Sequence, residues 1–141
     1  MAEWTSAEAA HQPISTGREP KGAKGLLVDD SDETRQALRE LLEGRGITIV
    51  GEAAEGAEGI GLARKLTPDV VLMDLKMPGM GGIEATKIIT SSLPDTRIIV
   101  LTTFDDESLK RRADEAGAAA YLVKAGSPEL ITDAIFHALG S

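Results

Sequence analysis

The sequence contains no cysteine, which excludes disulfide bonds, thiolate-ligated metals and a thiol nucleophile. Aromatic residues make up only 3% of the chain, so a core must be built from aliphatic side chains. No apolar run approaches the roughly 18–20 residues that a membrane-spanning helix needs, and the N-terminus lacks the apolar segment of a secretory signal. These absences predict a cytoplasmic protein with no membrane partner.

Positive charge is also scarce, because 15 Lys and Arg stand against 23 Asp and Glu, a net charge of −8. A domain of this charge is not expected to bind nucleic acid directly, since that needs a basic face.

The 141 residues suffice for one domain with a core. We predict a disordered or tag-like tail over residues 1–22, which shows no hydrophobic periodicity, and a folded domain over residues 23–140.

Five short apolar runs alternate with five segments of helical pattern. The runs lie at 25–28, 47–53, 70–73, 97–101 and 119–123, and the helical segments lie at 31–46, 56–66, 83–90, 105–117 and 127–140. Near-continuous apolar strands that alternate with helices predict an α/β fold with a parallel sheet covered on both faces. Five strands favour an open, doubly wound sheet of order 2-1-3-4-5, the flavodoxin-like arrangement.

Polar side chains follow four of the five predicted strands. Asp29 and Asp30 follow the first strand, Asp74 the third, Thr102 the fourth and Lys124 the fifth. Because the carboxyl ends of parallel strands meet at one edge of the sheet, where open α/β folds bind ligands, we expect these side chains to share one crevice.

Three carboxylates in one crevice repel one another, by about 4 kcal/mol for two unit charges 4 Å apart at an effective dielectric near 20. Lys124 supplies one compensating charge, and an all-oxygen donor set favours Mg²⁺ as another. A carboxylate beside Mg²⁺, a hydroxyl and a lysine has the groups that phosphoryl transfer requires, with Asp74 as the attacking group and Thr102 and Lys124 on the phosphoryl oxygens.

At these positions the sequence resembles the receiver domain of a two-component response regulator. The motifs are VDD at 28–30, DLKMPGMGG at 74–82, LTT at 101–103 and YLVK at 121–124, and their order and spacing are more specific than any single motif. The segment LTTFDDE resembles in particular receivers that precede LuxR-type helix-turn-helix DNA-binding domains.

The resemblance implies a phosphoacceptor switch that assists its own phosphorylation and dephosphorylation, not an enzyme with a separate substrate. Asp74 would accept a phosphoryl group from a sensor histidine kinase. Asp30, Asp74 and the backbone carbonyl of Lys76 would ligate Mg²⁺, with Asp29 acting mainly through water.

The resemblance also assigns the switch. Thr102 would move toward the phosphorylated Asp74, Tyr121 would turn inward behind it, and Lys124 would pair with a phosphoryl oxygen. The face made by the fourth helix, the fifth strand and the last helix would then change and alter a partner contact. A homodimer or an output contact is expected there, and Phe136 and His137, which lie off the main apolar stripe of the last helix, are candidates for it.

The expected output is transcription regulation by a DNA-binding domain outside this chain, and the protein would contact DNA only through that domain. The alternative is a stand-alone receiver that controls a partner protein.

A less favoured alternative is a haloacid-dehalogenase-like phosphatase, because residues 30–34 match D-x-D-x-T, with Asp30 as nucleophile and Asp32 as general acid. That reading lacks a later acidic pair after Lys124 and leaves Asp74 without a role.

Overall fold

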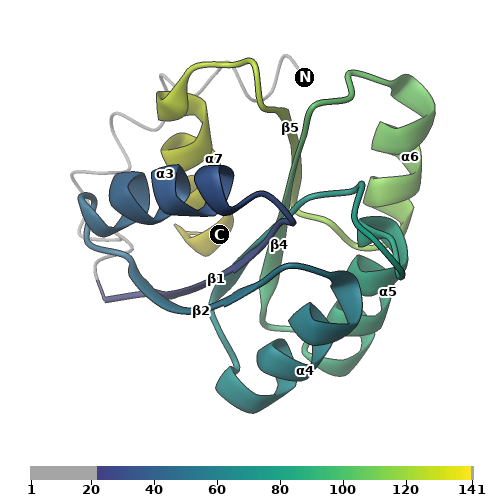
Figure 1. Cartoon of the computed structure of the whole chain (residues 1–141), viewed down its shortest axis with the longest axis horizontal. Coiled ribbons are helices and arrows are strands. Elements are labelled where there is room, and N and C mark those ends of the chain that lie inside the picture. Colours follow the sequence, from purple (N-terminus) through teal and green to yellow (C-terminus); the bar gives the residue numbers. More distant parts are fainter. Residues whose placement is uncertain (1–21, 141) are drawn as a thin grey trace.

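The computed structural model describes residues 22–140, in which strands and helices alternate as predicted (Figure 1). The strands are β1 (Lys24–Val28), β2 (Thr48–Ala53), β3 (Val70–Met73), β4 (Arg97–Thr102) and β5 (Ala120–Val123). The helices are α3 (Asp32–Glu43), α4 (Gly56–Leu66), α5 (Gly82–Ser92), α6 (Glu107–Glu115) and α7 (Pro128–Gly140). The tail predicted over residues 1–22 lies, except for its last residue, outside the described residues.

The five strands form one parallel sheet of order β2-β1-β3-β4-β5, which confirms the predicted topology. The register sets Val28 of β1 opposite Met73 of β3. The next residues, Asp29 and Asp74, therefore leave two neighbouring strands side by side.

Helices cover both faces of the sheet, α3 and α7 on one face and α4, α5 and α6 on the other (Figure 1). Successive strand residues point to opposite faces, so Leu26 and Val28 pack toward α4, while Leu27 packs with the α3 and α7 residues. Nearly all of the buried apolar residues are aliphatic, as expected from the scarcity of aromatics, and Tyr121 is the aromatic member of the described core. The interior is therefore two aliphatic layers that hold the sheet between them.

Side-chain caps begin two of the helices, α3 and α6. The Ser31 hydroxyl accepts a hydrogen bond from the Thr34 N–H at 3.1 Å and so caps α3, as predicted. Helix α5 continues to Ser92, beyond the predicted end at 90, and the hydroxyls of Ser91 and Ser92 donate to carbonyls one turn earlier, at 2.8 and 2.9 Å. None of the helices in the described part of the chain combines the length and the apolarity that crossing a bilayer requires.

The loop between β3 and α5 folds back closely against the end of β3. The Gly82 N–H donates to the Leu75 carbonyl at 3.0 Å. A Cβ atom on Gly82 would lie 2.1 Å from the Asp74 carbonyl oxygen and 2.8 Å from the Leu75 Cα. A side chain at position 82 would therefore displace the backbone that carries Asp74.

We expect Gly82→Ala to lower the free energy of unfolding by about 1–3 kcal/mol, because the new methyl group would overpack rigid backbone. Gly61→Ala is the matched control, since position 61 is exposed in α4 and its Cβ would have no neighbour within 4 Å. It should raise the free energy of unfolding by roughly 0.5–1 kcal/mol through helix propensity. Urea unfolding would measure both changes, and equal stabilities of the two variants would contradict the prediction.

Candidate functional site

Three carboxylates meet at the carboxyl edge of the sheet, as the strand exits predicted. One carboxylate oxygen from each of Asp29, Asp30 and Asp74 lies within 4.8 Å of the other two. Asp29 and Asp74 are only 3% and 7% exposed, whereas Asp30 is exposed. The cluster thus has two buried members beside one that faces solvent.

Backbone groups and a single ammonium hold the two buried carboxylates. Asp29 Oδ1 accepts a hydrogen bond from the Ser31 N–H at 2.9 Å, and Asp74 Oδ1 accepts one from the Leu75 N–H at 2.9 Å. Lys124 Nζ lies 2.7 Å from Asp29 Oδ2 and 3.8 Å from Asp74 Oδ2. Lys124 therefore bridges the outward oxygens of both acids and is paired more closely with Asp29.

Negative charge at Asp74 is poorly compensated. Burial is the largest cause that raises the pKa of Asp74, and the nearby Asp29 carboxylate raises it further. Lys124 and the backbone N–H groups of Leu75 and Lys76 only partly oppose them. Three carboxylates share one ammonium, so the donor set fits a hard divalent cation such as Mg²⁺, which prefers carboxylate, carbonyl and water oxygens.

Thr102 and Tyr121 both bind the backbone of Phe104, in the loop between β4 and α6. The buried Thr102 Oγ1 accepts a hydrogen bond from the Phe104 N–H at 3.3 Å, and the Tyr121 hydroxyl donates to the Phe104 carbonyl at 2.6 Å. Burial raises the pKa of Tyr121 and keeps this phenol a donor. The Tyr121 ring is already inside the protein here, and its predicted turn on phosphorylation stays a prediction.

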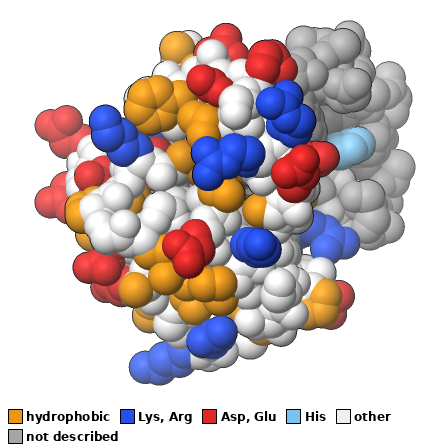
Figure 2. Space-filling view, turned by 90° about the vertical axis from the view of Figure 1, so that its right-hand side faces the viewer, with side chains coloured by type: hydrophobic (Ala, Val, Ile, Leu, Met, Phe, Trp, Pro, Cys, Tyr) orange, Lys and Arg blue, Asp and Glu red, His pale blue; other side chains and the backbone are white. Residues whose placement is uncertain are grey.

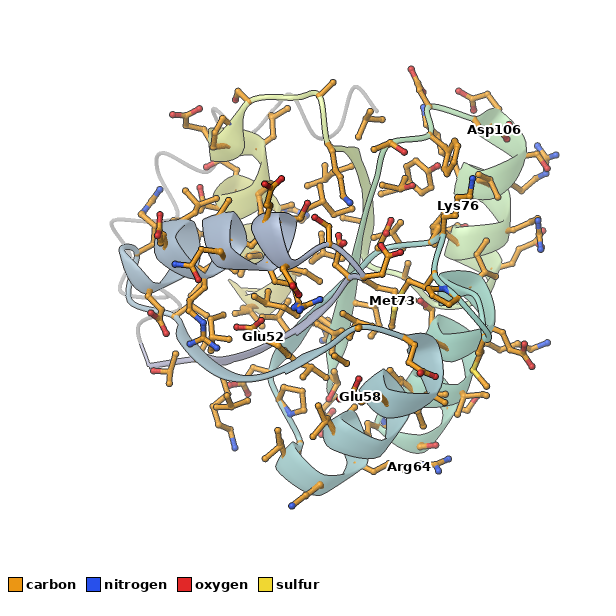
Figure 3. All side chains as sticks on the ribbon, viewed as in Figure 1. Glu52, Glu58, Arg64, Met73, Lys76 and Asp106 are labelled. Atoms are coloured by element: carbon orange, nitrogen blue, oxygen red, sulfur yellow. The ribbon has the colours of Figure 1, made fainter. Side chains whose placement is uncertain are left out.

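The loops that follow β3 and β4 also touch through their side chains. The Lys76 ammonium lies 5.6 Å from the centroid of the Phe104 ring, a cation–π contact. In Figure 3, Lys76 lies on the α6 side of the site, whereas Met73 points into the interior. The Phe104 ring is 38% exposed. The mouth of the site is therefore bordered by Lys76 and Phe104.

Arg35, in the first turn of α3, binds the backbone of the acidic loop, and the sequence pattern did not identify it. Its guanidinium donates to the Asp29 carbonyl, to the Asp32 carboxylate and, at 2.9 Å, to Glu52 Oε1 on β2. Arg39 binds the other oxygen of Glu52, at 2.7 Å. No spacing rule relates Arg35 to Glu52, because only the packing of α3 against β2 brings them together.

Asp32 lies away from the acidic cluster. Its side chain is 91% exposed and pairs with Arg35 one turn along α3. The phosphatase alternative needs Asp32 as a general acid beside Asp30, whereas the cluster is completed by Asp74. The geometry therefore favours the site centred on Asp74.

The sequence model for a family described as the response regulator receiver domain matches residues 26–136. Among curated proteins, the chain is 50% identical over 111 residues to the transcriptional regulatory protein LiaR of Bacillus subtilis, a match covering 78% of this chain and 53% of LiaR. It is 44% identical over 111 residues to the response regulator UvrY of Escherichia coli, covering 78% and 51%. The chain thus spans about half the length of these curated relatives.

Solved structures give the same result. The structure of a two-component response regulator of the LuxR family from an Aurantimonas species is similar with a TM-score of 0.81 and 40% identity, over 84% of this chain and 86% of that one. The signal receiver domain of the response regulator NarL from Mycobacterium tuberculosis is similar with a TM-score of 0.78 and 30% identity, over 85% and 98%.

We expect Asp74→Asn to raise the free energy of unfolding at pH 7 by about 1–2 kcal/mol, because it removes a buried charge that burial and Asp29 both disfavour. The raised pKa means that the folded protein binds the Asp74 proton more tightly than the unfolded chain does. The free-energy cost of burying the ionised Asp74 carboxylate is therefore fully present above the pKa that Asp74 has in the folded protein. This cost fades as pH falls from there toward the ordinary pKa of aspartate.

Urea unfolding in EDTA at several pH values between 7 and 4 would test this dependence, and the advantage of the Asn variant should shrink as pH falls. Asp95→Asn, on the exposed turn before β4, is the control and should change stability little at any of these pH values. A stability gain at Asp74 that does not change with pH would count against the charge explanation.

Proposed function

Because the chain belongs to the response regulator receiver domain family, we propose that it is a Mg²⁺-dependent switch in which Asp74 accepts a phosphoryl group from a sensor histidine kinase. The observation that carries this proposal is the position of Asp74 at the exit of a central strand, buried, and clustered with Asp29 and Asp30 beside Lys124. The proposed receiver domain spans residues 23–140.

In the proposed step an Asp74 carboxylate oxygen attacks phosphorus, the bond from phosphorus to the histidine nitrogen breaks, and an acyl phosphate forms. Asp74 Oδ1 accepts a hydrogen bond from the Leu75 N–H, and Oδ2, which faces Lys124 at 3.8 Å, is the proposed nucleophile. Asp30, Asp74 and the Lys76 carbonyl would hold Mg²⁺, with Asp29 acting mainly through water. The ion, when bound, screens the charge of the incoming phosphoryl oxygens.

Lys124 and Thr102 would bind the phosphoryl group once it is on Asp74. Lys124 would leave its 2.7 Å pair with Asp29 and bind a phosphoryl oxygen. The Thr102 hydroxyl, which accepts from the Phe104 N–H, would instead donate to a second phosphoryl oxygen. Since Tyr121 binds the same Phe104 backbone, movement of Thr102 would be transmitted to Tyr121 and to α6. This supports a population shift of the face formed by α6, β5 and α7.

The partner contact proposed for this face is a homodimer. Phe136 was predicted to contribute, but it is only partly exposed and the Arg45 guanidinium lies 4.9 Å from its ring centroid. Phe104 is the large apolar side chain exposed in the described residues, and it adjoins α6. Phe104 is therefore the better candidate for an apolar dimer contact that responds to Asp74.

The proposed output is transcription regulation through a DNA-binding domain outside this chain. In support, LiaR is named a transcriptional regulatory protein, and the Aurantimonas protein is named a response regulator of the LuxR family. On the face in Figure 2, the basic side chains of the described residues are scattered among acidic and apolar ones. With a net charge of −8, this supports an indirect route to DNA. A stand-alone receiver that controls a partner protein is the alternative.

Acetyl phosphate with Mg²⁺ should add one phosphoryl group to the wild-type chain, visible by intact mass. Asp74→Asn should abolish the adduct because it removes the nucleophile. Asp30→Asn should keep it but require at least about tenfold more Mg²⁺. Asp32→Asn should still take up the phosphoryl group, because Asp32 lies outside the carboxylate cluster and the asparagine amide oxygen can still accept from Arg35. Loss of the adduct in Asp30→Asn together with full labelling of Asp74→Asn would support the phosphatase alternative instead.

Beryllofluoride with Mg²⁺ mimics the phosphorylated state and should promote a dimer detectable by sedimentation velocity. Phe104→Ala should raise the dimer dissociation constant by about tenfold, equivalent to about 1.4 kcal/mol. Phe136→Ala should have a smaller effect, because Arg45 covers that ring. An unchanged sedimentation coefficient of the wild type on activation would contradict the homodimer.

A further inference from the structure

We propose that Arg35 is a positioning residue for the acidic cluster: its guanidinium holds the peptide between Asp29 and Asp30, and Glu52 of β2 holds the guanidinium. The inference rests on the proposed function, because it concerns the affinity of the three carboxylates for Mg²⁺. It assigns this affinity in part to a residue that touches none of the carboxylates of the cluster.

The first step of the argument is how the backbone leaves β1. The Asp29 N–H still donates to the Ala53 carbonyl of β2 at 2.9 Å, as in the sheet. The Asp29 carbonyl instead accepts a hydrogen bond from Arg35 Nη1. At the peptide that joins Asp29 to Asp30, the carbonyl is therefore hydrogen-bonded by Arg35 and not by a neighbouring strand. Asp30 is exposed, so the direction of its carboxylate depends on how firmly this peptide is held.

The second step is that the guanidinium is itself well anchored. The Arg35 side chain is only 13% exposed and binds acceptors at three places: the end of β1, the start of α3, and Glu52 on β2. The hydrogen bond from Arg39 is the largest cause that lowers the pKa of Glu52, and Arg35 adds to it against the effect of burial. Glu52 thus stays ionised as an anchor.

A lysine could not replace this arrangement. The rigid, planar fork of a guanidinium presents donors in several fixed directions at once, whereas an ammonium is a point charge on a flexible chain. We therefore expect the geometry of the Arg35 contacts, and not only its charge, to matter for the site.

The third step compares Arg35 with Lys124, the other cation close to the cluster. Lys124 binds Asp29 Oδ2 directly, so it competes with any metal that approaches that oxygen. Arg35 binds the carbonyl of the same residue and leaves the carboxylate oxygens free. It therefore holds the acidic loop without occupying the site, and its contacts do not have to break when a metal binds.

Arg39 provides a matched control. It binds Glu52 through two nitrogens, at 2.7 and 2.9 Å, and also Glu43, so it belongs to the same ion-pair network between α3 and β2. Its hydrogen bonds go to Glu43 and Glu52 and not to Asp29. If Arg35 served only to attach α3 to β2, loss of either arginine would have similar consequences.

The experiment is a calorimetric Mg²⁺ titration of the unphosphorylated chain, with thermal unfolding in EDTA as a separate measure of stability. Arg35→Gln and Arg35→Lys should each weaken Mg²⁺ binding by about tenfold, as is typical when a residue that orients a metal ligand is lost. Arg39→Gln should lower the unfolding temperature but change the Mg²⁺ dissociation constant by less than about twofold.

Wild-type affinity in both Arg35 variants, or an equal loss in Arg39→Gln, would overturn the inference while leaving the proposed function intact. Arg35→Lys keeps the charge beside Glu52 and so allows the comparison if Arg35→Gln does not fold. Wild-type protein that fails to bind Mg²⁺ would overturn the proposed function and this inference with it.

Discussion

Repulsion among three carboxylates gathered at one edge of a parallel sheet is the constraint on which the rest of this structure depends. Asp29, Asp30 and Asp74 lie within 4.8 Å of one another, and two of them are almost fully buried. Such an arrangement is costly in an apolar protein interior. It persists because the parallel register brings the ends of β1 and β3 together, and because the Lys124 ammonium and backbone N–H groups compensate the charge in part. The remaining excess of negative charge is what suits the site to a divalent ion.

The two cations contribute in different ways. Lys124 contacts the carboxylates directly and is free to exchange one anion for another, which suits a group that meets an incoming phosphoryl oxygen. Arg35 contacts the backbone behind the carboxylates and is held by Glu52. One cation can therefore move during the proposed transfer, while the other keeps the acidic loop in place.

The fold supplies a route from the site to the surface through a single loop. Thr102 at the end of β4 and Tyr121 on β5 bind the same residue, Phe104, through its backbone, and the Phe104 ring stays partly exposed. A small movement of the Thr102 hydroxyl would thus change how Phe104 is held, and Phe104 is also bound by Tyr121 on the face formed by α6, β5 and α7.

The sequence by itself predicted the five strands and five helices and the strand ends that Asp29, Asp74, Thr102 and Lys124 follow, because periodicity and strand ends are local properties of the chain. The strand order could be inferred because alternation of strands and helices is typical of the doubly wound fold. It also carried the resemblance to response regulator receivers, which the comparisons confirm. Only the tertiary structure decided that Lys124 pairs most closely with Asp29, that Thr102 and Tyr121 meet at one residue, and that Arg35 stands behind the acidic loop. Those contacts depend on strand register and helix packing between residues distant in the chain, which no local pattern encodes.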